Sequence, residues 1–335
     1  MRKILHIGLG RTGTTFFQFN VLPLIAKIGL IKFLNDRESL IKLQEASYYD
    51  LEVDNKNIWG NSIDDIPIII SYEGLIGAPS NWLTNFEFLK KNFDQDVEII
   101  ISFREPIDWL RSNYLYAVKD GKVIYEDDYF INNKDERWKF FKKYPVHNFM
   151  NIDYINYQEL VDLYKSYFKK VFCIPMQKLI CPRSFCDVIG ILDYSNDELI
   201  SYIDYNSLIF KNKPKLNVGY SSIAIKFTKN FERILNLLGL SLKKFNSTLY
   251  GLEFEKKKRN INKSTLVTQV KNLIKNLIKY FLKRLSWKRL WYKYIPSIIT
   301  LPKYKLPKNL SFHNTNIEES REFFYQLCNR KVNKK

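Results

Sequence analysis

The sequence is poor in the residues that build metal sites and disulfide frameworks. It has only three histidines and four cysteines in 335 residues. The cysteines show no metal-ligand spacing, and there are too few histidines to complete a site. We therefore predict no metal centre and interpret the cysteines as free thiols of a reducing compartment, with a disulfide between Cys181 and Cys186 as the alternative. The four cysteines are Cys173, Cys181, Cys186 and Cys328.

Long apolar segments are also missing. Met1-Arg2-Lys3 leads directly into a short apolar run that glycines interrupt, so the pattern lacks the h-region of a signal peptide. No run approaches the roughly 18 apolar residues of a transmembrane helix. The sequence thus predicts a cytoplasmic protein, either soluble or peripheral on the inner face of the membrane.

Acidic residues are absent from one long stretch. Between Lys256 and Lys305 there are fifteen Lys or Arg and no Asp or Glu, which accounts for most of the net charge of +18. Within it, residues 264–294 place a row of lysines beside an apolar stripe. Two interpretations stay open: a packed helix with a solvated basic face, or a contact with an anionic membrane or anionic acceptor. We do not expect a nucleic acid partner.

The chain begins with a pattern of strand, glycine-rich loop and helix. Residues 4–7 form a short apolar run, glycines follow at Gly8, Gly10 and Gly13, and apolar residues then recur with helical spacing. Such a loop directs backbone N–H groups towards one point at the positive end of a helix. This arrangement favours the binding of an anion, above all a phosphate.

The loop nevertheless departs from a nucleoside triphosphate site. Gly8 and Gly13 have the Walker A spacing, but Thr14 stands where that motif needs its lysine. The apolar strand over residues 97–103 is followed by Arg104, whereas an NTPase of this kind needs a strand that ends in a magnesium-binding Asp. Both departures argue against hydrolysis of ATP or GTP.

Two further stretches have recognisable patterns. One is the run Arg11, Thr12, Gly13, Thr14 and Thr15, and the other is Arg104 followed eight residues on by Ser112. They resemble the 5′-phosphosulfate loop and the 3′-phosphate motif of the sulfotransferases that use 3′-phosphoadenosine-5′-phosphosulfate (PAPS), and the string from His6 to Gln18 is similar to the bacterial branch of that family. The resemblance implies that these residues bind PAPS or its product adenosine 3′,5′-bisphosphate without a metal. It also implies an acceptor that is a saccharide of a surface glycan, or another hydroxyl or amine.

The order of apolar runs predicts an α/β fold. Strands are expected over residues 4–7, 67–70, 97–103 and 171–174. Helices between them are expected over 81–92, from Pro106 to Gly121, and over 157–168. We predict a P-loop NTPase-like parallel sheet with helices on both faces, in a domain of residues 1–240. Residues 241–335 would form a basic, mainly helical extension packed on it.

Transfer of a sulfuryl group requires a general base for the acceptor and stabilisation of charge on the leaving phosphate. Arg11 is the predicted source of positive charge. Glu73 is the first candidate for the base, because it follows a strand at the edge where such sheets bind ligands; its alternative is a solvated carboxylate. His6 is the second candidate, and its alternative is a hydrogen-bonded core residue.

Two other functions stay open at this point. A P-loop kinase of small molecules would bind ATP with magnesium, although the Lys and Asp of that class are missing. A basic protein that binds a glycan or a membrane, and whose nucleotide site is degenerate, would explain the charge but not the intact loop.

Overall fold

The computed structural model describes residues 1–35, 65–119, 125–135, 149–212, 222–237 and 315–329, with short pieces at 40, 42–43, 45–47, 51–53, 58–59 and 306. The chain divides into two compact units. The first comprises Met1–Leu110, Asn151–Leu216 and Phe312–Lys335. The second comprises Arg111–Met150 and Asn217–Ser311.

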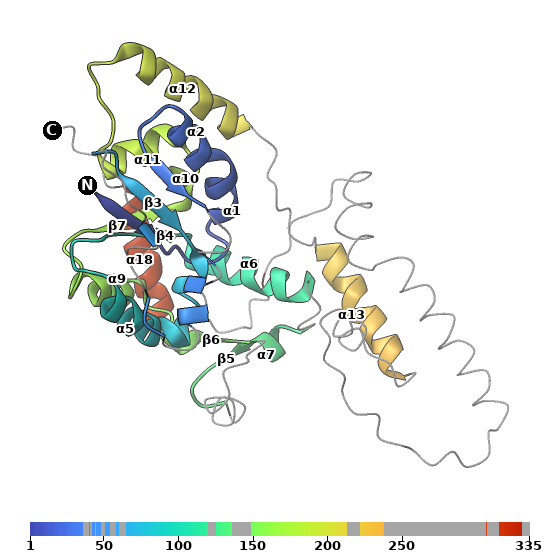
Figure 1. Ribbon diagram of the computed structural model, residues 1–335. Coiled ribbons are helices and arrows are strands. Elements are labelled where there is room, and N and C mark those ends of the chain that lie inside the picture. The colour runs from blue at the N-terminus through green and yellow to red at the C-terminus, as the bar shows by residue number, and fades with distance from the viewer. Residues whose placement is uncertain are drawn as a thin grey trace. The chain divides into compact units, whose positions relative to one another are not determined.

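A five-stranded parallel sheet forms the centre of the first unit (Figure 1). Its strands follow the order β2-β3-β1-β4-β7, so the first strand of the chain is central. The strands are β1 (Lys3–His6), β2 (Lys32–Leu34), β3 (Ile68–Ser71), β4 (Glu98–Phe103) and β7 (Val171–Pro175). This confirms the predicted α/β fold and the predicted pairing of the strands at 4–7 and 97–103.

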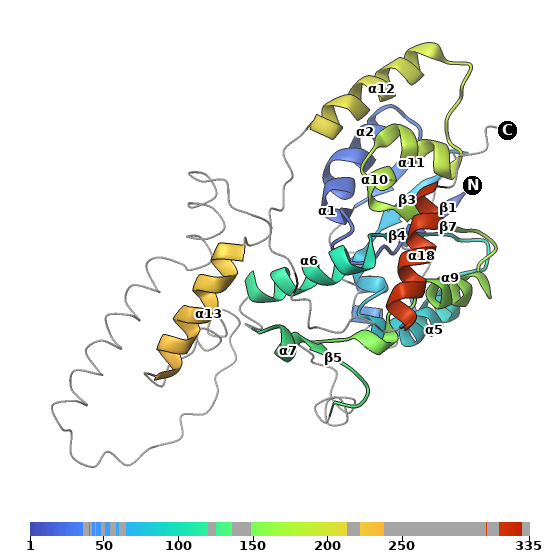
Figure 2. The same ribbon diagram turned by 180° about the vertical axis from the view of Figure 1, so that it is seen from behind.

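Helices cover both faces of the sheet (Figures 1 and 2). On one face lie α1 (Thr14–Phe16), the π-helix η1 (Phe17–Val21), α2 (Leu22–Lys27), α10 (Met176–Leu179) and α11 (Pro182–Ile189). On the other lie α5 (Trp82–Asn92), α9 (Tyr157–Lys165) and α18 (Thr315–Asn329). Further elements of this unit are η2 (Glu73–Leu75), η3 (Pro79–Asn81), η4 (Ile152–Tyr154) and α12 (Asp197–Asn212).

Successive side chains of each strand point to opposite faces of the sheet, and because most of them are apolar, both faces are apolar. Ile100 of β4 belongs to a buried cluster with Phe17 and Phe185 from the first helix layer. Phe103, three residues on and directed to the other face, contacts the rings of Tyr157 and Phe323 from α9 and α18. The sheet is therefore buried on both sides, which explains why its strands are almost continuous apolar runs.

The second unit has fewer described elements. The helix α6 (Pro106–Lys119) begins in the first unit and ends in the second. After it come α7 (Glu126–Tyr129), the paired short strands β5 (Phe130–Ile131) and β6 (Met150–Asn151), and α13 (Ser222–Leu237). Lys229 of α13 forms an ion pair with Glu126, a carboxylate that is almost fully buried.

Several predictions have a mixed outcome. The strand β2 was not predicted, because it is a three-residue edge strand that begins with an exposed lysine. The predicted helical segment 264–294 lies outside the described residues, and the boundary at residue 240 stays a prediction. From the extension beyond that boundary, α18 packs on α9 and β7.

The four cysteines are free thiols, as predicted. Within the described ranges, no helix combines the length and the hydropathy needed to cross a membrane.

Candidate functional site

Three of the predicted site segments meet at one edge of the sheet. The strands β1, β3 and β4 are adjacent and parallel, so their carboxyl ends lie side by side. The glycine-rich loop of residues 7–13 follows β1, Glu73 follows β3, and Arg104 follows β4. Ligands of open parallel sheets bind at this edge.

Two carbonyl groups of the loop are fixed by hydrogen bonds from other parts of the protein. The carbonyl of Gly10 accepts a hydrogen bond from the indole N–H of Trp109 at 2.7 Å, and that of Gly13 accepts one from the Phe17 N–H at 3.0 Å. Left-handed backbone at Arg11 (φ 71°) and Gly13 (φ 86°) produces this turn. The N–H groups of Thr14 and its neighbours open the helical segment, where first-turn amides lack acceptors within the helix.

The two predicted phosphate-binding arginines are close together. The Arg104 guanidinium donates from Nη1 to the carbonyl oxygen of Arg11 at 3.3 Å, across 93 residues of chain. The neighbouring Glu105 pairs with Arg321 at 3.1 Å and accepts a hydrogen bond from the Asp108 N–H. The side chain of Arg104 thus lies at the main chain of the loop; that Arg11 and Arg104 bind one ligand together stays a prediction.

The predicted base also lies at the loop. Glu73 is half-buried at the start of η2, and its carboxylate accepts a hydrogen bond from the hydroxyl of Thr14. Thr14 is almost fully buried, whereas Thr15 is exposed. A carboxylate beside the first turn of the helix is placed to receive a proton from a group held at the loop.

His6 lies in the core instead of facing a ligand. Its side chain is fully buried, with Nδ1 2.7 Å from Ser71 Oγ and Nε2 3.2 Å from Ser102 Oγ. Burial lowers the pKa of His6 to about 3, so the ring is neutral. This geometry matches the hydrogen-bonded core residue that was the alternative to a catalytic His6.

Thr12 differs from its predicted role as a ligand contact. Its side chain is fully buried, and both its N–H and its hydroxyl donate to the carbonyl of Leu9. Thr12 Oγ1 also lies 2.6 Å from Ser102 Oγ. These contacts make Thr12 a part of the internal structure of the loop.

Ser112 lies on the second turn of α6, within the second unit, and is half-buried. Its contact with a 3′-phosphate stays a prediction. The other two histidines, His147 and His313, lie outside the described residues.

The sequence analysis missed the serines that surround His6. Ser71 and Ser102 each end the same tetrapeptide, Ile-Ile-Ile-Ser, in the two strands that flank β1. Gln18 was part of the resemblance but had no role; its amide donates to Ser71 at the carbonyl (2.9 Å) and at Oγ (3.1 Å). The repeated tetrapeptide was the available signal.

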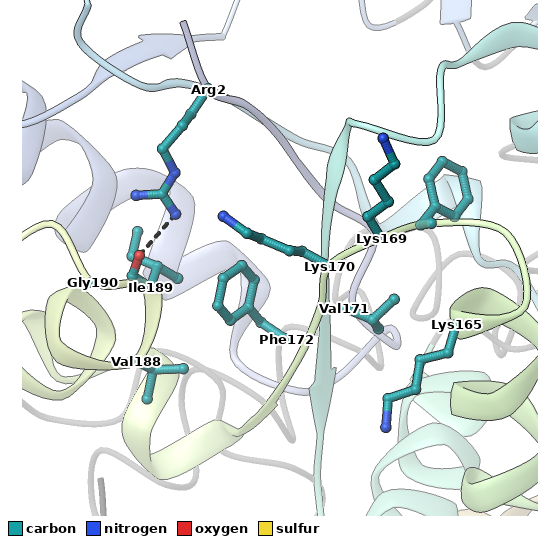
Figure 3. A pocket seen from close by; sticks show the side chains of 10 residues that line it. Arg2, Lys165, Lys169, Lys170, Val171, Phe172, Val188, Ile189 and Gly190 are labelled. Carbon is teal, nitrogen blue, oxygen red and sulfur yellow. Dashed lines mark hydrogen bonds between the residues drawn. The ribbon is translucent and has the colours of Figure 1, made fainter. Parts of the chain in front are cut away.

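A pocket of about 980 Å³ lies at the opposite edge of the sheet (Figure 3). Arg2 and Lys170, which line it, both bind Glu98, whose side chain is 5% exposed. Burial raises the pKa of Glu98, but hydrogen bonds from Arg2 and Lys170 outweigh this effect and lower it overall. Arg2 also donates to the Ile189 carbonyl (Figure 3). We interpret this cluster as a structural ion network, separate from the loop.

Comparisons with known proteins add a distant likeness. No protein-family model matches the chain, and no curated protein matches it. The chain is similar to the crystal structure of a sulfotransferase from Alicyclobacillus acidocaldarius, with 13% identity and a TM-score of 0.39 over 64% of this chain and 97% of that one. A likeness at this level carries no argument about activity, so the proposals below rest on the residues themselves.

Proposed function

We propose that the chain is a sulfotransferase that moves a sulfuryl group from PAPS to a hydroxyl or amine of an acceptor. One observation carries this proposal: the Arg104 guanidinium lies 3.3 Å from the Arg11 carbonyl. That contact joins the loop that would bind the 5′-phosphosulfate to the arginine that would bind the 3′-phosphate, although the two are distant in the sequence. The lysine and aspartate that a magnesium-dependent kinase needs are absent from the corresponding positions.

The residues of the loop fit the anionic groups of this nucleotide. A Cβ atom built on Gly10 would meet no atom within 4 Å, so there is open space beside the loop. Arg11 and Arg104 supply positive charge, and the amides of Thr14 and Thr15 begin the helix. In this proposal these groups hold the phosphosulfate, while Arg104 and Ser112 hold the 3′-phosphate.

When bound, PAPS would supply the sulfuryl group that is transferred. The chain would contribute orientation at the loop, positive charge from Arg11 on the leaving phosphate, and a base for the acceptor. Glu73 is the proposed base, since its carboxylate already accepts a hydrogen bond from Thr14 at the loop. A metal ion has no role in this scheme.

Calorimetry with adenosine 3′,5′-bisphosphate and with ATP–magnesium tests the proposal. We expect binding of the bisphosphate without metal and much weaker binding of ATP–magnesium. Arg104→Ala should lower the affinity by roughly 1.5–3 kcal/mol, because a charge-assisted contact is lost. Ser112→Ala should cost about 1 kcal/mol. Preferred binding of ATP–magnesium would instead favour a small-molecule kinase.

Replacement of the base should affect turnover and spare the affinity for the nucleotide. We expect Glu73→Gln to lower turnover by roughly 10²–10⁴-fold with little change in bisphosphate affinity, because a base acts on the acceptor. Turnover is measured with a panel of hydroxyl and amine acceptors. Full activity of Glu73→Gln would remove Glu73 from the mechanism.

The acceptor and the location belong to the same proposal. A saccharide of a surface glycan is the proposed acceptor, modified in the cytoplasm. Residues 264–294 are a proposed contact for an anionic glycan or for the inner face of a membrane. A screen of saccharides against non-carbohydrate alcohols would identify the acceptor class.

A further inference from the structure

A chain of hydrogen bonds runs through the core beneath the loop. From Gln18 it passes to Ser71, then to Nδ1 of His6, and from Nε2 of His6 to Ser102. It continues from Ser102 to Thr12 and ends at the carbonyl of Leu9. These hydrogen bonds thus join three adjacent strands to the loop at one end and to η1 at the other.

The direction of each hydrogen bond follows from the number of protons available. The hydroxyl of Thr12 donates to the Leu9 carbonyl, so Ser102 must donate to Thr12 Oγ1. The only proton of Ser102 is then used, and His6 Nε2 must donate to Ser102 Oγ.

The other half of the chain follows from the neutral ring of His6. A neutral imidazole carries one N–H group, so Nδ1 is an acceptor and Ser71 donates to it. Ser71 Oγ keeps a lone pair for the Gln18 amide. Every member is satisfied, and the tautomer of His6 with the proton on Nε2 is defined.

The loop backbone packs directly on this chain. A Cβ atom on Gly8 would lie 1.8 Å from Ser102 Oγ and 2.6 Å from His6 Nε2. The Leu9 N–H donates to the Ser102 carbonyl at 3.3 Å. A change in the hydrogen bond between His6 and Ser102 therefore acts on the loop at two successive residues.

We infer that His6 is a positioning residue that holds the glycine-rich loop in its anion-binding conformation by donating from Nε2 through Ser102 to Thr12. The inference rests on the proposed function for the identity of the anion. The link through Ser71 to Gln18 ties the same ring to the helix that follows the loop. His6 itself contacts no ligand.

Two substitutions of His6 test separately the hydrogen bond to Ser102 and the hydrogen bond to Ser71. Gln has its amide nitrogen at the distance of Nε2 from the backbone and can donate to Ser102. Asn has its carbonyl oxygen at the distance of Nδ1 and can accept only from Ser71. We expect His6→Gln to bind adenosine 3′,5′-bisphosphate within about threefold of the wild type, and His6→Asn to bind about tenfold more weakly.

Ser102→Ala should likewise weaken bisphosphate binding about tenfold. The matched control is Ser320→Ala, since Ser320 is a fully buried serine of α18 that accepts from the Tyr157 N–H at 2.9 Å. This control should lose comparable stability in urea while its bisphosphate affinity stays within about twofold. Equal affinities of Ser102→Ala and Ser320→Ala, or of His6→Gln and His6→Asn, would overturn the inference.

Hydrogen exchange of the ligand-free protein separates this inference from the proposed function. In Ser102→Ala, the amides of residues 8–13 should exchange at least about tenfold faster than in the wild type and in Ser320→Ala. If the wild type does not bind the bisphosphate, the proposed function fails, and the exchange result alone decides the positioning role. Unchanged exchange in Ser102→Ala would refute that role.

Discussion

At the scale of single residues, the loop depends on backbone that most side chains avoid. Arg11 and Gly13 both have positive φ, a conformation that costs an L-residue roughly 1–2 kcal/mol. Gly13 avoids this cost, and it also leaves space for α10. A Cβ atom there would lie 2.9 Å from Ile180 Cγ2 and 3.1 Å from Met176 Cγ.

Gly13→Ala should therefore lower the free energy of unfolding by about 2–3 kcal/mol, from backbone strain and crowding together. Gly29→Ala is the control, because Gly29 also has a positive φ (77°) but a Cβ atom there would meet nothing within 4 Å. It should lose only about 1 kcal/mol. Urea titrations of the two variants measure the difference, and equal losses would show that α10 does not crowd the loop.

His6 should also make stability depend on pH. Its pKa is lowered to about 3 by burial, so between the unfolded value near 6.5 and about 3 the unfolded chain binds a proton that the folded chain does not. Stability is thus fully present above about pH 6.5 and falls as the pH falls, by up to about 1.4 kcal/mol per unit.

The measurement is the free energy of unfolding at pH 7.5 and pH 5.5 in the wild type and in His6→Gln. This window lies above the range where Glu98 titrates. The wild type should lose about 1.4 kcal/mol more than the variant over the interval. The same loss in both proteins would mean that His6 is already accessible to protons in the folded state.

At the scale of elements, α18 connects distant parts of the sequence. The Ser320 hydroxyl accepts from the Tyr157 N–H, Glu319 accepts from the Asn156 amide at 3.0 Å, and Arg321 pairs with Glu105 beside the site. The C-terminal helix therefore holds the start of α9, which lies 163 residues before it in the sequence.

The packing of α18 has a direct test in two neighbouring aromatic residues. Phe324 is 3% exposed and Tyr325 is 49% exposed. Phe324→Ala should cost about 3–5 kcal/mol of unfolding free energy, because it leaves a cavity in the core. Tyr325→Ala should cost less than about 1 kcal/mol. Small losses in both, by thermal or urea unfolding, would contradict the inclusion of α18 in the α/β unit.

At the scale of the whole molecule, the charge is much larger than one nucleotide needs. The net charge is +18, and the stretch 256–305 carries most of the excess, whereas the candidate site uses two arginines. Such a surplus attracts anionic partners through a field that salt screens. The nucleotide and the second partner should accordingly be separable by mutation.

We predict that one quadruple Lys→Gln variant weakens binding to an anionic polysaccharide at low salt and leaves bisphosphate affinity unchanged. The four positions are Lys271, Lys275, Lys279 and Lys283. Co-sedimentation at low and high salt, with anionic vesicles as a second arm, measures the effect. Each Lys near an anionic membrane surface adds about 1 kcal/mol. If the variant sediments with both partners as the wild type does, the four lysines belong to a solvated face and bind neither partner.

Several features of the fold could be predicted because their signals are local. The central strands are continuous apolar runs, so their positions follow from a few neighbouring residues. The edge strand β2 has three residues, of which the first is an exposed lysine, and this pattern does not differ from a loop. Its existence depends on pairing with β3, which residues 32–34 do not encode by themselves.

By itself, the sequence determined the parallel α/β sheet and the glycine-rich turn after β1, because glycine spacing and apolar runs are local signals. Only the tertiary structure decided what His6, Thr12 and Glu73 contact. The partners of His6 come from β3 and β4, 65 and 96 residues away. The sheet order that makes these strands neighbours of β1 places His6 in the core. The same order brings Glu73, the other candidate base, to Thr14.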